Sequence, residues 1–164
     1  PSGVPGRGYI FHKDTMIVNL IGRVFMNTLD SPFHAIDKLL EDNGNLPKII
    51  LLDFHAEATS EKGALGWYVD GRVSAIVGTH THVPTADHRI LPKGTAFVSD
   101  VGMVGTIDSI IGNTPDDVLH RFLKQTPNRL GIPNGPSKFN SVLIDIDDAT
   151  GLALDIRRID REVI

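Results

Sequence analysis

Apolar runs typical of strands alternate along the chain with segments whose apolar residues follow helical spacing. This pattern predicts strands separated by amphipathic helices. Two short runs, 9–12 and 15–21, flank Lys13-Asp14 and predict a pair of strands joined by a turn. The continuous apolar runs Lys48–Phe54 and Val73–Val77 are typical of strands that are buried on both faces. Further strands are expected at residues 95–99, 141–146 and 152–156, the last two as a hairpin.

Helical spacing is found in the segments between these strands. One helix begins at Ser31–Phe33, with proline in its first turn, and ends at Asn43-Gly44. Another covers Thr59–Asp70, and a third begins at Thr114–Asp117 and runs to about Gln125. On the helix at 59–70, the residues expected to share one face are Ala64, Leu65 and Tyr68. The alternation of strands and helices, followed by a hairpin, predicts an α/β fold with a mixed sheet.

The beginning of the chain has the composition of a loop. Residues 1–8 contain three Gly and two Pro. We therefore expect this segment to be an internal loop of a longer parent chain. On this interpretation residues 1–164 form a single domain that lacks its N-terminal part.

Composition narrows the function classes. The 164 residues are 41% hydrophobic and 22% charged, which is enough for one domain with a substantial core. A net charge of −4 argues against DNA as a partner, although a bound metal ion could still attract a small phosphorylated substrate. Cysteine is absent, which excludes disulfides and cysteine zinc sites. No apolar run approaches about 18 residues and no signal peptide is visible, so no membrane-spanning helix is expected, and the absence of cysteine is compatible with the cytosol.

Candidate chemistry gathers where two of the buried strands end. Asp53, His55 and Glu57 alternate along the first strand end, so their side chains are expected on one face. His80 and His82 follow the next buried strand, and open α/β sheets place their sites at such strand ends. Imidazole suits Zn, Mn, Fe, Ni or Co, so the three histidines are predicted metal ligands rather than buried, hydrogen-bonded histidines. Asp53 and Glu57 would orient these histidines; alternatively, Asp53 only ends the strand and Glu57 only charges a helix N-terminus.

A third strand end carries the segment Ser99–Gly105, which includes Asp100 and Gly102. Such a loop can approach a ligand closely and offer backbone N–H groups to anion oxygens, or it can be a simple turn. The residues leave both interpretations open. His88 could line the site, although an ordinary loop histidine is the simpler interpretation. Surface or packing positions are expected for His12, His34 and His120.

Several consecutive strings of residues resemble one known family. The strings are Asp53–Lys62, Val77–Val83, Thr85–Asp87, Arg89–Leu91 and Asp100–Gly102. Together they resemble the 2′,3′-cyclic-nucleotide phosphodiesterase branch of the bacterial calcineurin-like metallophosphoesterases. The resemblance extends over residues 19–147.

This resemblance implies a mixed β-sandwich flanked by helices that holds two divalent metal ions, Mn, Fe or Zn. It implies that His55, His80 and His82 are metal ligands. From their positions, Asp53, Glu57, Asp100 and Gly102 are expected to support the site or the substrate loop. The implied reaction is hydrolysis of small phosphodiesters such as 2′,3′-cyclic nucleotides, with a metal-bridging water as nucleophile. Family members are cytoplasmic homo-oligomers.

The upstream motifs of the family have no counterpart here, since the pairs Gly-Asp, Glu-Asn and Asn-His do not occur. The resemblance therefore implies that this chain is the C-terminal portion of the enzyme. The histidine that acts as general acid would lie in the missing upstream segment, and this chain alone would be inactive.

Two other functions compete with this interpretation. An amidohydrolase also places His-x-His at a strand end, but its barrel needs about 250 residues and more strand–helix repeats. A non-catalytic fragment that binds metal or nucleotide without turnover is the other alternative.

Overall fold

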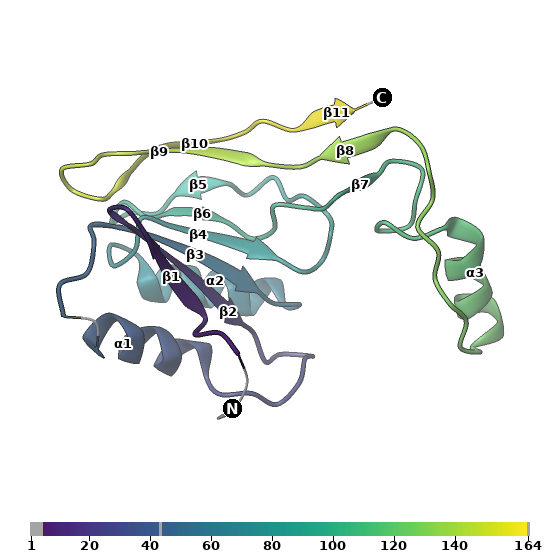
Figure 1. Ribbon diagram of the computed structural model, residues 1–164, viewed down its shortest axis with the longest axis horizontal. Coiled ribbons are helices and arrows are strands. Elements are labelled where there is room, and N and C mark those ends of the chain that lie inside the picture. Colours follow the sequence, from purple (N-terminus) through teal and green to yellow (C-terminus); the bar gives the residue numbers. More distant parts are fainter. Residues whose placement is uncertain (1–4, 43, 164) are drawn as a thin grey trace.

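A six-stranded sheet forms the centre of the computed structural model, which describes residues 5–42 and 44–163 (Figure 1). Its strand order is β1-β2-β3-β4-β6-β5. The four central strands run parallel and are β2 (Thr15–Ile21), β3 (Ile49–His55), β4 (Ala75–Thr79) and β6 (Ala96–Val98). The edge strands β1 (Tyr9–His12) and β5 (Arg89–Ile90) are antiparallel to their neighbours. The sheet is open, so the amidohydrolase barrel does not describe this fold.

Helices α1 (Pro32–Asp42) and α2 (Thr59–Val69) cover one face of this sheet (Figure 1). They connect β2 to β3 and β3 to β4. Alternate residues of a strand point to opposite faces, so Ile50, Leu52 and Phe54 of β3 enter the core beneath the helices. The residues between them, including Asp53 and His55, point to the opposite face, which carries the candidate chemistry.

A hairpin covers part of that opposite face. Its strands are β9 (Val142–Ile146) and β10 (Ala153–Arg158). Ala153 and Ile156 of the hairpin pack against Ala75, Ala96 and Val98 of the central sheet, forming a second, smaller core. A three-stranded sheet lies beside the hairpin and contains β7 (Val104–Thr106), β8 (Ser137–Phe139) and β11 (Arg161–Val163).

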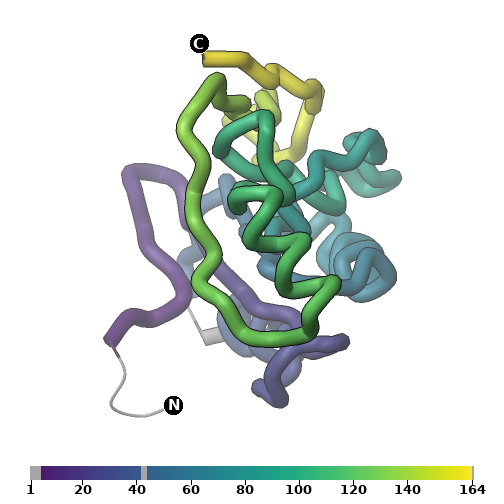
Figure 2. Tube along the Cα trace, turned by 90° about the vertical axis from the view of Figure 1, so that its right-hand side faces the viewer, coloured from purple at the N-terminus to yellow at the C-terminus, as the bar shows by residue number. Residues whose placement is uncertain are grey.

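Helix α3 (Pro115–Lys124) lies to one side of the sheet, in the connection between β7 and β8 (Figure 1). In Figure 2 this helix and the segment that follows it stand at the front. The returning segment is held against the helix because the amide of Gly131 donates to Asp117 Oδ2 at 2.9 Å. Among the described residues, no helix is both long and apolar enough to cross a membrane.

The α/β class with a mixed sheet is confirmed, and the predicted strands and helices occur close to the expected bounds. Residues 5–8 lie in no helix or strand, whereas residues 1–4 and Asn43 are outside the described part of the chain. Four short strands were not predicted: β5, β7, β8 and β11. Each has only two or three residues, too few to show a periodic pattern.

The predicted face of the helix at 59–70 is wrong. Ala64 and Tyr68 are exposed, and only Leu65 of the expected three is buried. The buried positions are Glu61, Lys62, Leu65, Gly66 and Val69. Two charged residues on the buried side hide the helical pattern, because periodicity assigns charge to the solvent face.

Candidate metal site

The carboxyl ends of β3 and β4 bring the predicted site residues to one edge of the sheet. His55 pairs with Thr79 in the parallel register, and Asp53 lies opposite Asn19 of β2. Residues that pair across strands share a face, so these four side chains stand together on the face opposite α1 and α2. The parallel register thus converts two separate strand ends into one polar cluster.

Asp53 and Thr79 determine which nitrogen of His55 carries the proton. Thr79 Oγ1 donates to Asp53 Oδ1 at 2.9 Å, and Asn19 Nδ2 donates to Asp53 Oδ2 at 2.8 Å. Thr79 Oγ1 also lies 3.1 Å from His55 Nδ1. The single hydroxyl proton already goes to the carboxylate, so the hydroxyl accepts from Nδ1–H. Nε2 of His55 therefore keeps its lone pair available.

His80 stands against this free nitrogen. Its Nδ1 lies 3.0 Å from His55 Nε2, and the two rings meet edge to face with centroids 4.7 Å apart. The other nitrogen of His80, Nε2, lies 2.9 Å from Glu57 Oε2. Asp53, His55 and Glu57, predicted to share a face, are thus linked by a chain of short polar contacts through Thr79 and His80.

His82 takes a different direction. Its Nδ1 donates to the carbonyl oxygen of Ile111 at 2.8 Å, and the ring is exposed. This bond also leaves Nε2 with a free lone pair. Within residues 5–42 and 44–163, no three His, Cys, Asp or Glu side chains are gathered closely enough to hold a metal ion. The structure therefore brings His55 and His80 together but not His82, and the three-histidine metal set stays a prediction.

The donor pair His55–His80 has the chemistry and spacing of a partial metal site. Histidine nitrogens bind zinc-like ions at about 2.0–2.1 Å, so two of them on one ion lie roughly 2.8–3.4 Å apart, the shorter distance at right angles and the longer one in a tetrahedral arrangement. The observed separation of 3.0 Å between His55 Nε2 and His80 Nδ1 fits this range. The Thr79–Asp53 pair behind His55 is the kind of outer support that fixes the tautomer of a metal-ligating histidine.

The segment after β6 forms a turn whose amides are already used. Val101 N donates to the Gly78 carbonyl at 2.9 Å, and Met103 N donates to the His82 carbonyl at 3.1 Å. Gly102 N donates to Asp100 Oδ1 at 2.9 Å. Of the two interpretations of Ser99–Gly105, the structure favours the turn, because these N–H groups are not free to bind an anion.

Asp100 lies buried beneath the histidine segment. Burial alone raises the pKa of the Asp100 carboxyl, but hydrogen bonds from Lys62, Thr81 and Gly102 outweigh it and hold that pKa below its ordinary value. The residue that the sequence assigned to a supporting role is therefore a charged anchor inside the protein.

Sequence reasoning missed four residues that build this edge: Asn19, Thr79, Glu61 and Lys62. Glu61 is buried and accepts the amides of Arg23 and Val24 at 3.0–3.1 Å, which holds the segment after β2 next to the site. Asn19 and Thr79 reach Asp53 and His55 only because the strands pair in this register. Nothing in their local spacing distinguishes them from other polar strand residues.

The remaining histidines do not join this cluster. His12, His34 and His120 are exposed, as expected. His88 is half-buried, and in the described part of the chain its Nδ1 has no hydrogen-bond partner.

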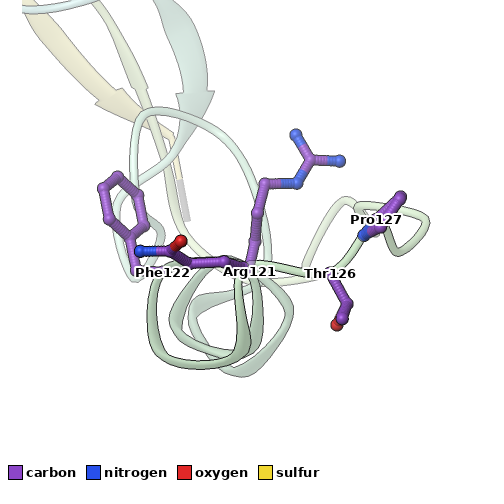
Figure 3. A pocket seen from close by; sticks show the side chains of 5 residues that line it. Arg121, Phe122, Thr126 and Pro127 are labelled. Carbon is purple, nitrogen blue, oxygen red and sulfur yellow. The ribbon is translucent and has the colours of Figure 1, made fainter.

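One cavity lies beside His82, and a second lies at the end of α3. The first, of about 460 Å³, is bordered by His82, Met103 and Ile111. The second, of about 480 Å³, is surrounded by Arg121, Phe122 and Pro127 (Figure 3). No His, Asp or Glu lines the second cavity, so it adds no catalytic or metal-binding group.

The fold and the site together define an open α/β protein with a histidine and carboxylate cluster at the carboxyl edge of its parallel strands. The family model described as "YmdB-like protein" matches residues 1–159. The chain belongs to the YmdB-like family.

Known proteins similar to this chain include an enzyme and two solved structures. A 2′,3′-cyclic-nucleotide 2′-phosphodiesterase of Bacillus subtilis (strain 168) is 49% identical over 163 residues, which cover 97% of this chain and 62% of the relative. A hypothetical protein from Thermus thermophilus is 42% identical with a TM-score of 0.91, covering 99% of this chain and 64% of that one. A structure described as a novel phosphatase from Mycoplasma pneumoniae is 32% identical with a TM-score of 0.86, covering 96% and 58%. The chain thus spans about three-fifths of the length of its curated relative.

Proposed function

We propose that the protein hydrolyses phosphodiesters of the 2′,3′-cyclic nucleotide class at the carboxyl edge of its parallel strands. One observation carries the proposal: His55 Nε2 and His80 Nδ1 face each other at 3.0 Å, a spacing suited to a shared metal ion. The name of the Bacillus relative and the phosphatase description of the Mycoplasma structure support the reaction class.

In this proposal His55, His80 and His82 contribute ligands to two divalent metal ions, Mn, Fe or Zn, as in calcineurin-like enzymes. When bound, such ions polarise the phosphoryl oxygens and activate a water for in-line attack. Asp53 and Thr79 keep the Nε2 lone pair of His55 available, and the Ile111 carbonyl does the same for His82. Glu57 Oε2 accepts a hydrogen bond from Nε2–H of His80 and fixes the plane of that ring.

The proposal assigns the general acid to no described residue. The acid, further metal ligands and the remainder of a calcineurin-like sandwich would come from the segment that precedes this C-terminal portion in the whole protein. We therefore propose that this chain alone binds metal but does not reach the turnover of the whole enzyme. This division of roles keeps metal binding and hydrolysis separable in experiments.

Metal binding tests the proposal directly. Titration with Mn²⁺ in a calorimeter should show binding to the chain that falls by about ten- to a hundredfold or more when His55 or His80 is changed to Ala. His120→Ala, at an exposed position on α3, is the matched control and should leave the affinity unchanged. Hydrolysis of 2′,3′-cyclic AMP with Mn²⁺ by the whole protein should fall in the same variants. Equal Mn²⁺ affinity in the His55, His80 and His120 variants would contradict the metal site.

A further inference from the structure

A buried ion pair lies directly beneath the histidine segment. Lys62 Nζ of α2 is 2.8 Å from Asp100 Oδ2, and both side chains are only 2% exposed. Lysine is almost never fully buried unless it is paired, because removing its charge from water is costly. The two partners are 38 residues apart in the sequence, so the pair joins helix α2 to the turn that follows β6.

Asp100 does more than neutralise Lys62. Its Oδ2 also accepts the amide of Thr81 at 3.0 Å and the Thr81 hydroxyl at 2.7 Å. Its Oδ1 accepts the amide of Gly102 at 2.9 Å. One carboxylate thus binds α2, its own turn and the segment after β4 through four hydrogen bonds.

Thr81 stands between two residues with strained backbones. His80 has φ +113° and His82 has φ +67°, a region that residues other than glycine rarely adopt. Such conformations persist only where surrounding contacts over-determine them, and they cluster at functional sites. The two bonds from Thr81 to Asp100 lie at the residue between them, where they can hold both.

The packing around Gly78 shows how closely these elements meet. A Cβ at Gly78 would lie 1.8 Å from the Ser99 carbonyl oxygen and 3.1 Å from Lys62 Cδ. The end of β4, the Ser99 backbone and the Lys62 side chain are therefore in direct contact. Any residue with a Cβ atom at position 78 would displace the backbone beside Asp100.

We propose that Lys62 and Asp100 are positioning residues that hold the strained segment His80–His82 and so set the directions of its two imidazole rings. Asp100 binds the segment, and Lys62 keeps the buried carboxylate charged so that its bonds to Thr81 stay strong. The link from ring direction to metal binding rests on the function proposed above. The link from Asp100 to the backbone of Thr81 does not.

A purely stabilising ion pair would behave differently. Replacing both members of a buried pair with neutral groups is often neutral for stability, whereas removing one member leaves an unpaired buried charge. The double variant Lys62→Met with Asp100→Asn therefore separates the two roles. If the pair only stabilises the fold, the double variant should recover folding stability, Thr81 protection and Mn²⁺ affinity. If Asp100 positions the segment, the double variant should recover folding stability, but Thr81 should remain poorly protected.

Asp70 offers a matched control. Its carboxylate is also buried, and it accepts the amides of Lys93 and Thr95 at 3.0 and 3.3 Å. It contacts neither histidine. Asp70→Asn should therefore weaken the fold in a comparable way without changing the histidine segment.

The experiment measures amide hydrogen exchange at Thr81 by NMR on the metal-free chain, and Mn²⁺ affinity by calorimetry. We expect Asp100→Asn and the double variant to lose at least about tenfold in Thr81 protection and about ten- to a hundredfold in Mn²⁺ affinity. Asp70→Asn should change neither quantity. Thr81→Val should resemble Asp100→Asn in Mn²⁺ affinity, and Thr81→Ser should restore it because the hydroxyl is kept.

Retained Thr81 protection and Mn²⁺ affinity in the double variant would overturn the proposal. An equal loss in Asp70→Asn would overturn it as well. If Asp100→Asn and the double variant do not fold, the comparison of Thr81→Val with Thr81→Ser decides: equal affinities overturn the proposal. If the unaltered chain binds no Mn²⁺, the proposed metal site fails, while loss of Thr81 protection in Asp100→Asn would still support the positioning role.

Discussion

Helices α2 and α3 differ in which side chains they bury: α2 buries charged residues, whereas α3 leaves apolar residues exposed. α2 lies under the sheet and buries Glu61 and Lys62 together with Leu65. α3 has a far more regular apolar stripe, yet Leu119, Phe122 and Leu123 are all exposed. Val118 is its one buried residue among those the structure describes.

The contrast follows from where each helix lies. The first turn of α2 lies beneath the edge of the sheet where strands end, and loops there offer partners to its charges: backbone amides for Glu61 and a carboxylate for Lys62. Burial of a charge is tolerated when every polar contact is replaced. α3 projects to the side, where no described element covers its stripe. A helix's own pattern therefore shows which face can be buried, and only the surroundings decide which face is buried.

Replacing one leucine by alanine on each helix should give the largest difference in the free energy of unfolding. Leu65 is fully buried on α2, whereas Leu123 on α3 is 78% exposed. Leu65→Ala should lower the free energy of unfolding by about 2–5 kcal/mol, because it leaves a cavity in the core. Leu123→Ala should change it by less than about 0.5 kcal/mol. Urea denaturation of both variants measures this; similar losses would mean that α3 is packed as firmly as α2.

Removing a buried charge on α2 should have a smaller effect. Glu61→Gln leaves the amides of Arg23 and Val24 with a weaker, neutral acceptor, so we expect a loss of about 1–3 kcal/mol in unfolding free energy. Glu41→Gln on α1 is the control, since Glu41 is exposed. Equal stability of the two variants would show that the buried Glu61 carboxylate contributes nothing as a charge.

The charge on Asp100 should contribute modest stability at neutral pH that is lost only in acid. Its folded-state pKa lies below the ordinary value, because the hydrogen bonds from Lys62, Thr81 and Gly102 outweigh the opposing effect of burial. A depressed pKa contributes stability that is present above the unfolded-state value of about 3.9 and is lost as pH falls through the folded value. The stability gap between the unaltered chain and Asp100→Asn should therefore be widest near neutral pH and narrow below about pH 4. Thermal unfolding across this range tests the sign, and a gap that widens on acidification would contradict it.

Local pattern alone was sufficient for the strand–helix alternation and for the hairpin at 142–158. Continuous apolar runs define β3 and β4, and proline marks the beginnings of α1 and α3. The same local signals placed His55 and His80 at strand ends, and an open α/β sheet brings neighbouring strand ends together. That much of the candidate site follows from residues a few positions apart.

The partners of these histidines depended on the tertiary structure. Thr79 reaches His55 only because β3 and β4 pair in one particular register, and Asp53 and Asn19 meet for the same reason. His82 turns to the Ile111 carbonyl, 29 residues away, which no spacing rule indicates. Lys62 has the sequence pattern of a solvated helix residue, yet it is buried against Asp100. Sequence patterns report each residue's preference for water or for a neighbour along the chain, whereas hydrogen bonds between distant segments form only after the packing of those segments has set their distance and direction.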